Sequence, residues 1–225
     1  MNRMTVGGRR CFLEQVGRDG PVLLFPMGTD GSPEKEAADM ARQLNGCNGL
    51  LASFPCDDWN RELSPWPAPG LRQGESFEGG GQETLDWIAE KLCPALPDAS
   101  ARKRMIGGYS LAGLFALWAF LKTDLFCGAA SCSGSLWFPG FADVREKSTP
   151  PAGGVGYLSL GRREEKSRNP LLGTVGAQTR DTFAWCQRSR NIADSTLVWQ
   201  DGGHFDAPEE RTAAGLRWLL SHGAR

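Results

Sequence analysis

The sequence contains very little histidine: His204 and His222 are the only two among 225 residues. A reaction that needs an imidazole must therefore use one of these two side chains. The seven cysteines include no C-x-x-C pair, and with so few histidines we expect no zinc site and no cofactor. An odd number of thiols without such pairs is typical of small core residues in a reduced, cytoplasmic protein, which is the location that we expect.

A surplus of positive charge and long apolar segments are also missing. The 25 Lys and Arg residues are balanced by 26 Asp and Glu, so we do not expect nucleic-acid binding through phosphate contacts. The longest nearly unbroken apolar run, residues 111–121, is too short to span a bilayer and predicts a buried helix. Residues 1–20 hold no apolar segment of the signal-peptide kind. We therefore expect no membrane association.

Hydrophobic residues make up 40% of the chain, enough for the core of a single domain over residues 1–225. Short strand-like runs alternate with longer segments of helical period, which predicts an α/β fold with a mostly parallel central sheet and helices on both faces. The strand-like runs are residues 11–16, 21–26, 49–54, 104–108, 126–131, 156–160 and 196–200. The helical segments are residues 33–44, 83–92, 111–121, 171–188 and 209–221.

Two local features of this pattern lead to more specific predictions. Only residues 17–20 separate the first two strand-like runs, so we expect these runs to form an antiparallel hairpin at one edge of the sheet. Residues 55–81, rich in Pro, Gly, Ser and Trp, form the longest irregular segment. Because this segment follows a strand, we expect a loop over the carboxyl edge of the sheet, where ligands bind in open α/β sheets.

The segment with the clearest chemistry is residues 108–112, a G-x-S-x-A sequence between an apolar strand and a helix. A sharp strand-to-helix turn brings Gly108 and Ala112 together, so both must be small, and it lifts the hydroxyl of Ser110 above the sheet. This placement predicts Ser110 as a nucleophile. The alternative is a serine that only caps the helix. A second G-x-S, at residues 74–76, lies in a loop, which shows that the spacing alone proves little.

A serine nucleophile needs a base, usually histidine, and a carboxylate that orients the base. His204 lies in a glycine-containing loop just after the last strand-like run, whereas His222 lies at the end of the chain. We therefore predict His204 as the base. The carboxylate should follow the run at residues 156–160, where Glu164 is favoured and Glu165 is the alternative.

An oxyanion hole needs two backbone N–H groups that point to the developing negative charge. One should come from Leu111, the residue after the predicted nucleophile. The other should come from the loop after the strand-like run at residues 21–26, where Met27 and Gly28 are the candidates.

Together these motifs resemble the α/β-hydrolase superfamily over nearly the whole chain, and within it the esterase group that includes esterase D-like and enterochelin-esterase-like proteins. The resemblance implies hydrolysis of a carboxylic ester through an acyl-enzyme, with Ser110 as nucleophile, His204 as base and then acid, and Glu164 as orienting carboxylate. Ala112 departs from the family's usual second glycine. Some enterochelin-type esterases use serine and histidine alone, so such a dyad is the alternative. The segments that carry the resemblance are residues 57–60, 63–66, 107–118, 157–161, 163–166, 168–170 and 203–205.

The chain leaves little room for a large cap domain, because only residues 134–154 lie between two successive strand-like runs at the expected insertion point. Loops are therefore expected to shape a pocket for a small or medium ester. A thioesterase, amidase or acyltransferase on the same residues, or a non-catalytic binding protein with this fold, is the alternative. The candidate pocket residues, for which core packing is an equally good explanation of the tryptophans, are Tyr109, Trp59, Trp66, Trp137 and Asp58.

Overall fold

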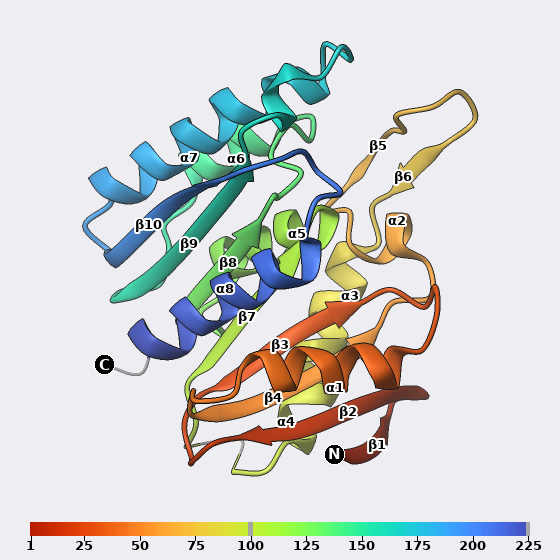
Figure 1. Cartoon of the computed structure of the whole chain (residues 1–225), viewed down its shortest axis with the longest axis vertical. Helices are drawn as coiled ribbons and strands as arrows, with labels where there is room; N and C mark the ends of the chain where they lie inside the picture. Colours follow the sequence, from red (N-terminus) through yellow and green to blue (C-terminus); the bar gives the residue numbers. More distant parts are fainter. Residues whose placement is uncertain (99–100, 224–225) are drawn as a thin grey trace.

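The computed structural model describes residues 1–98 and 101–223. Eight strands form one mixed sheet in the order β1-β2-β4-β3-β7-β8-β9-β10 (Figure 1). β2 is antiparallel to both β1 and β4, and the remaining pairs are parallel. The strands are β1 (Asn2–Val6), β2 (Arg9–Val16), β3 (Val22–Met27), β4 (Gly49–Pro55), β7 (Arg104–Tyr109), β8 (Gly128–Cys132), β9 (Gly154–Gly161) and β10 (Ile192–Gln200). A separate antiparallel hairpin consists of β5 (Pro67–Pro69) and β6 (Ser76–Glu78).

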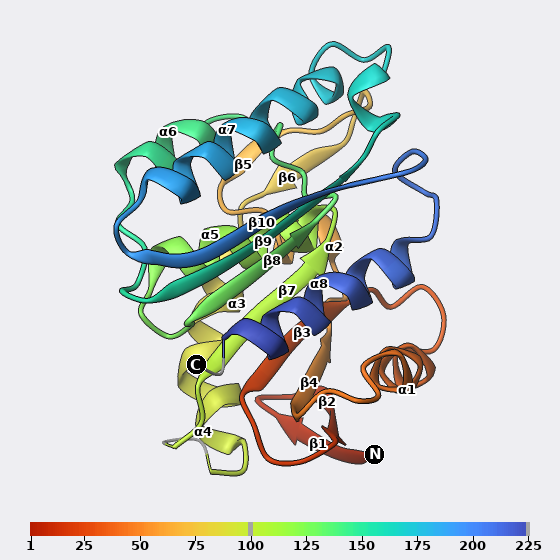
Figure 2. The ribbon, with the colours of Figure 1, turned by 60° about the vertical axis from the view of Figure 1, so that its left-hand side comes forward.

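Helices cover both faces of the sheet (Figure 2). One face carries α1 (Pro33–Gln43) and α8 (Pro208–His222). The other face carries α3 (Gly81–Trp87), α5 (Leu111–Lys122), α6 (Phe141–Lys147) and α7 (Val175–Arg188). The short helical segments are α2 (Trp59–Glu62), α4 (Cys93–Ala95), the π-helical η1 (Ile88–Leu92) and the 3-10 turns η2 (Glu164–Lys166) and η3 (Leu172–Thr174). This mostly parallel sheet with helices on both faces confirms the predicted α/β architecture.

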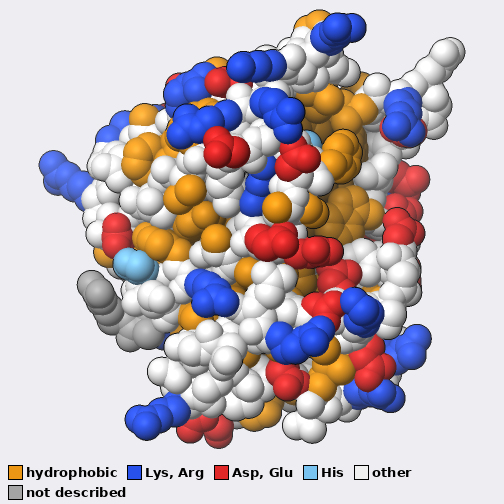
Figure 3. All heavy atoms as spheres, viewed as in Figure 1, with side chains coloured by type: hydrophobic (Ala, Val, Ile, Leu, Met, Phe, Trp, Pro, Cys, Tyr) orange, Lys and Arg blue, Asp and Glu red, His pale blue; other side chains and the backbone are white. Residues whose placement is uncertain are grey.

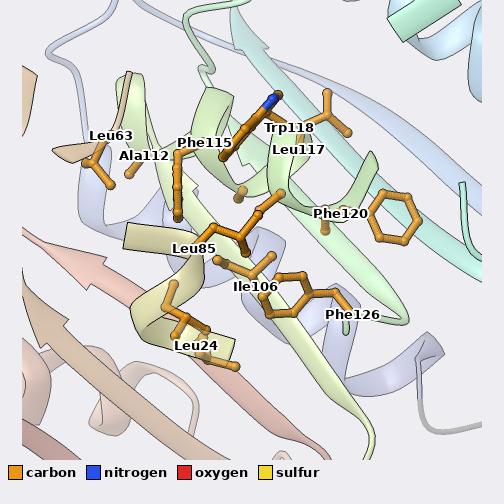
Figure 4. Close-up of a cluster of buried hydrophobic side chains, with 14 of the residues drawn as sticks. Leu24, Leu63, Leu85, Ile106, Ala112, Phe115, Leu117, Trp118, Phe120 and Phe126 are labelled. Atoms are coloured by element: carbon orange, nitrogen blue, oxygen red, sulfur yellow. The ribbon is translucent and has the colours of Figure 1, made fainter. Parts of the chain in front are cut away.

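Helix α5 forms the centre of the larger hydrophobic core. Every residue from Leu111 to Leu121 is buried, and the helix packs against β7 and β8 (Figure 4). Phe115 is 0% exposed and lies among apolar side chains of the sheet and of α3. Burial of such a side chain stabilises the fold by about 1.5–3 kcal/mol. None of the helices in the described part of the chain has both the length and the hydropathy to cross a bilayer.

The predicted hairpin between residues 11–16 and 21–26 was wrong. β2 pairs with β1 and β4, and β4 separates it from β3. The true hairpin joins β1 to β2 through Gly7 and Gly8, whose φ angles of 54° and 84° suit a two-residue turn of the type that matches strand twist. All six residues of β3 are buried, as expected for an interior strand covered on both faces.

Residues 55–81 are more ordered than the predicted loop. They contain α2 and the β5–β6 hairpin, which projects beyond the carboxyl ends of the parallel strands (Figure 1). Asp58 begins α2 as its N-cap, and its side chain accepts a hydrogen bond from the backbone N–H of Arg61. The segment therefore lies at the expected edge of the sheet, but it forms a short helix and a hairpin in place of an irregular loop.

Candidate active site

Ser110 lies in a strained turn between β7 and α5. Its φ of 58° and ψ of −120° fall in a region that residues other than glycine rarely adopt. A Cβ added at Gly108 would lie 2.6 Å from the Cβ of Ala112, closer than two non-bonded carbon atoms approach in proteins. This contact agrees with the steric argument made from the sequence, because a side chain at position 108 would force the turn open.

His204 lies between the serine and a carboxylate. Its Nε2 is 2.9 Å from the Oγ of Ser110, and its Nδ1 is 2.7 Å from Oε2 of Glu164. A proton on Nδ1 that is donated to the carboxylate leaves Nε2 free to accept the serine proton. His222 lies elsewhere: it ends α8, stacks on Trp218 and meets the carbonyl oxygen of that residue.

Glu164 is held by several donors at once. Its side chain is 5% exposed, and Oε1 accepts hydrogen bonds of 2.8 Å from the N–H of Gly161 and from the hydroxyl of Ser133. Burial raises the pKa of this carboxyl, but the hydrogen bonds from His204, Gly161 and Ser133 outweigh burial and hold the pKa below its usual value. The group is therefore kept ionised beside the imidazole.

Glu165, the alternative carboxylate, points away from this cluster. Its Oε2 accepts a hydrogen bond of 2.8 Å from Arg180 on α7. In the 3-10 turn η2 successive side chains point in different directions, so one glutamate faces His204 and the next faces α7. The structure thus brings Glu164, and not Glu165, to the histidine.

The predicted oxyanion-hole residues lie at the same edge of the sheet. Leu111 is the first residue of α5, so its N–H belongs to the free amino end of that helix. Met27 ends β3, the neighbour of β7, and Gly28 follows in the loop that leads to α1. The role of each N–H as an oxyanion donor stays a prediction.

Comparisons with known proteins identify the fold. No family model and no curated protein matches the chain. The siderophore hydrolase EstA from Aspergillus nidulans is similar in structure, with a TM-score of 0.76 and 16% identity over 99% of this chain and 94% of that chain. An IroE-like serine hydrolase from Shewanella oneidensis gives a TM-score of 0.74 and 15% identity over 95% and 76% of the two chains. The chain has the α/β-hydrolase fold.

The α/β-hydrolase fold predicted from the motifs is therefore confirmed. A dienelactone hydrolase from Anabaena variabilis has the same fold, with a TM-score of 0.60 and 17% identity over 98% of this chain and 96% of that chain. Within this fold the turn at Ser110 follows β7 and precedes α5, and His204 lies in the loop between β10 and α8.

The predicted pocket residues fall into two groups around the candidate site. Trp66 and Trp137 form an aromatic cluster with Phe77 and Phe138 near the β5–β6 hairpin, with ring centroids 5.1–6.2 Å apart. Trp59 instead lines a cavity of about 810 Å³ between α1 and α8. The tryptophans therefore do not form one wall.

Tyr109 and Asp58, the other two predicted pocket residues, make structural contacts. Tyr109 lines the same cavity as Trp59 and donates a hydrogen bond of 2.7 Å to the backbone carbonyl of His204. Asp58 is exposed and is occupied as the N-cap of α2. Tyr109 thus supports the histidine loop in addition to lining a cavity.

Figure 3 shows apolar side chains gathered in a hollow between the β5–β6 hairpin and the segment after β9, with a histidine at its edge and acidic side chains below it. Phe205, which follows His204, is 90% exposed. Its ring packs edge to face against the imidazole, with the two ring centroids 5.2 Å apart. An apolar rim thus surrounds part of the site.

Two residues of the site escaped sequence reasoning. Ser133, at a φ of 44°, follows β8 and donates to Glu164, and no motif marks it. Arg211 on α8 is a charged side chain that is only 4% exposed and reaches Glu164 at 3.4 Å. The sequence spacing could have indicated that Arg211 is buried. It lies four and eight residues before the buried Gly215 and Leu219, and so belongs to the core-facing stripe of the helix.

Proposed function

We propose that this protein is a serine hydrolase that cleaves a carboxylic ester of a small or medium substrate through an acyl-enzyme. The observation that carries the proposal is the chain of two hydrogen bonds from Ser110 through His204 to Glu164, 2.9 Å and 2.7 Å long. Each group has the partner that its role requires: a nucleophile beside a base, and a base beside a carboxylate. A binding protein with this fold would not need the three groups in contact.

In the first half-reaction the Oγ of Ser110 attacks the ester carbonyl carbon while its proton moves to Nε2 of His204. Glu164 stabilises the imidazolium that forms and keeps the ring in the tautomer with a proton on Nδ1. The proton on Nε2 then passes to the leaving alkoxide as its bond to the carbonyl carbon breaks. The products of this step are the free alcohol and an acyl group on Ser110.

Water completes the cycle by the same route in reverse. His204 takes a proton from the water molecule, whose oxygen attacks the acyl carbon, and the proton then returns to the Oγ of Ser110 as the acid leaves. In both steps the carbonyl oxygen carries negative charge. The N–H groups of Leu111 and of Met27 or Gly28 are the proposed donors to this oxyanion, and the amino end of α5 adds its dipole.

Apolar side chains beside the site bear on the class of substrate. The apolar hollow and the exposed ring of Phe205 favour an ester with an apolar or aromatic part. Two of the solved structures with the same fold, both from Aspergillus nidulans, are named siderophore hydrolases. A substrate panel should therefore include acyl esters of increasing chain length, aromatic esters, siderophore esters, and matched thioesters and amides, since the same three residues also serve those bonds.

The nucleophile is tested by Ser110→Ala beside Ser76→Ala, the serine of the other G-x-S sequence, which is exposed. We expect Ser110→Ala to lose hydrolysis of p-nitrophenyl acetate and covalent labelling by a fluorophosphonate, and Ser76→Ala to keep both. Labelling that persists in Ser110→Ala would refute the assignment. A wild-type protein that neither hydrolyses the panel nor accepts the label would favour the non-catalytic alternative.

A further inference from the structure

Arg211 joins three parts of the site that are distant in sequence. Its Nη1 donates to the carbonyl oxygen of Gly203 at 2.9 Å and to the hydroxyl of Tyr109 at 3.3 Å, and it lies 3.4 Å from Oε1 of Glu164. Its Nη2 donates to the carbonyl oxygen of Asp201. The loop after β10, the end of β7 and the turn after β9 therefore meet at one guanidinium group.

This arrangement suits arginine and no other side chain. The planar guanidinium offers five N–H donors in a fixed fork, whereas the ammonium of lysine is a compact group on a flexible stem. Arg211 and Glu164 are 4% and 5% exposed, so each charge is removed from water and is balanced mainly by the other and by hydrogen bonds. A buried pair of this kind adds little net stability and is better explained by the geometry that it enforces.

The loop that carries His204 depends on this anchor. Arg211 holds the carbonyl oxygens of residues 201 and 203, on either side of Gly202. The φ of Gly202 is 98°, in the left-handed region that glycine adopts without strain. On the solvent side the loop is tied by the carboxylate of Asp206, which accepts from the N–H of Gly203 and pairs with Arg163. The N–H of Arg163 also donates to the carbonyl oxygen of Gly202 at 2.9 Å, and Arg162 lies 3.7 Å from the carboxylate of Asp201. The side chains of these ion pairs are all more than half exposed. The buried anchor is thus the stronger restraint.

We propose that Arg211 is a positioning residue that fixes His204 between Ser110 and Glu164, by holding the carbonyls of Asp201 and Gly203, Tyr109 and Glu164 in one array. The inference rests on the proposed function for its catalytic consequence. Tyr109 completes the array from the other side, because its hydroxyl accepts from Arg211 and donates to the carbonyl of His204. A displacement of the base by about 1 Å is enough to lower a rate by about 100-fold.

The test compares Arg211→Met and Arg211→Lys with Arg217→Met, a matched control for an exposed arginine on the same helix. Turnover is expressed per fluorophosphonate-labelled site, so that a partly unfolded sample does not count as a slow enzyme. We expect Arg211→Met to lower kcat by about 10- to 100-fold with little change in KM. Arg211→Lys should recover part of this loss, because it keeps the charge and some of the donors, and Arg217→Met should match the wild type.

Hydrogen exchange separates this inference from the proposed function. The backbone amides of residues 202–206 should exchange faster in both Arg211 variants by about tenfold or more, whether or not the protein hydrolyses esters. Unchanged loop exchange together with kcat within twofold of the wild type would overturn the proposal. So would the failure of both variants to fold, which would assign Arg211 to stability. A wild type without hydrolysis or labelling, but with faster loop exchange in the variants, would refute only the proposed function.

Discussion

The turn at Ser110 and the helix α5 that follows it differ in what they bury. From Leu111 to Leu121 the helix buries apolar side chains and glycine, packed against the sheet. The turn and the loops around it bury the charges of Glu164 and Arg211 and hold Ser110 at a positive φ. Apolar contacts in α5 stabilise the folded protein, whereas backbone strain at the turn and the removal of charges from water around it are unfavourable.

This contrast suggests that stability and activity are divided between the two regions. A change in the loops should alter the reaction far more than the free energy of unfolding. A change inside α5 should do the opposite, provided that the remaining folded molecules keep the same turn.

Ser110→Gly should separate the two properties most widely. Loss of the nucleophile should lower kcat by about 10⁴-fold or more. The free energy of unfolding should rise by about 1 kcal/mol, because glycine adopts the φ of 58° and ψ of −120° without strain. Calorimetry should show Tm higher by about 2–4 °C, and Ser76→Gly should show no such gain. A lower Tm would mean that the turn is not strained.

Glu164→Gln and Glu165→Gln form the next pair. The amide in Glu164→Gln would keep the shape of the side chain but not the charge that stabilises the imidazolium, so kcat should fall by about 10²- to 10⁴-fold. Glu165→Gln should stay near the wild type, because its carboxylate faces Arg180. Steady-state hydrolysis of p-nitrophenyl acetate measures both. If neither variant loses even tenfold, the site works as a serine-histidine dyad.

Phe115→Ala tests the other region. Phe115 is 0% exposed within α5, so its truncation should lower the free energy of unfolding by about 3–5 kcal/mol. Phe205→Ala, at a residue that is 90% exposed, should change it by less than about 0.5 kcal/mol. Urea unfolding provides the comparison. Turnover per labelled site in Phe115→Ala should stay within twofold of the wild type, and a larger loss would show that the core also positions the turn.

The parts of this site that could be predicted from the sequence are those fixed by contacts between residues close together in the chain. The turn at residues 108–112 is set by contacts within five residues, so the need for small side chains at Gly108 and Ala112 can be deduced without the rest of the fold. The G-x-x-acid spacing likewise favoured Glu164 over Glu165, and the structure places only Glu164 beside His204.

The parts that were missed depend on distant contacts. Arg211 meets Tyr109 across 102 positions of sequence, and nothing in a single sequence reports such a contact. The hairpin prediction failed because short separation suggested that two runs pair, whereas β4, which follows much later, lies between them. The adjacent glycines Gly7 and Gly8 favour a two-residue hairpin turn and could have indicated that β1 pairs with β2. The pattern of apolar runs alone did not predict β1.

The smallest expected effect is a change of stability with pH that arises from Glu164. Its pKa in the folded protein lies below the ordinary value of 4.5, since its hydrogen bonds outweigh its burial. A carboxyl with a lowered pKa contributes stability that is fully present above pH 4.5 and is lost as the pH falls through the folded-state pKa. The wild type should therefore be more stable than Glu164→Gln at neutral pH, and the two should converge in acid, where the protonated acid and the amide are both neutral. Urea unfolding at several pH values measures this difference. The difference between Ser110→Gly and the wild type should stay constant over the same range, because neither residue titrates, and a gap for Glu164→Gln that widens below the folded-state pKa would contradict the assignment.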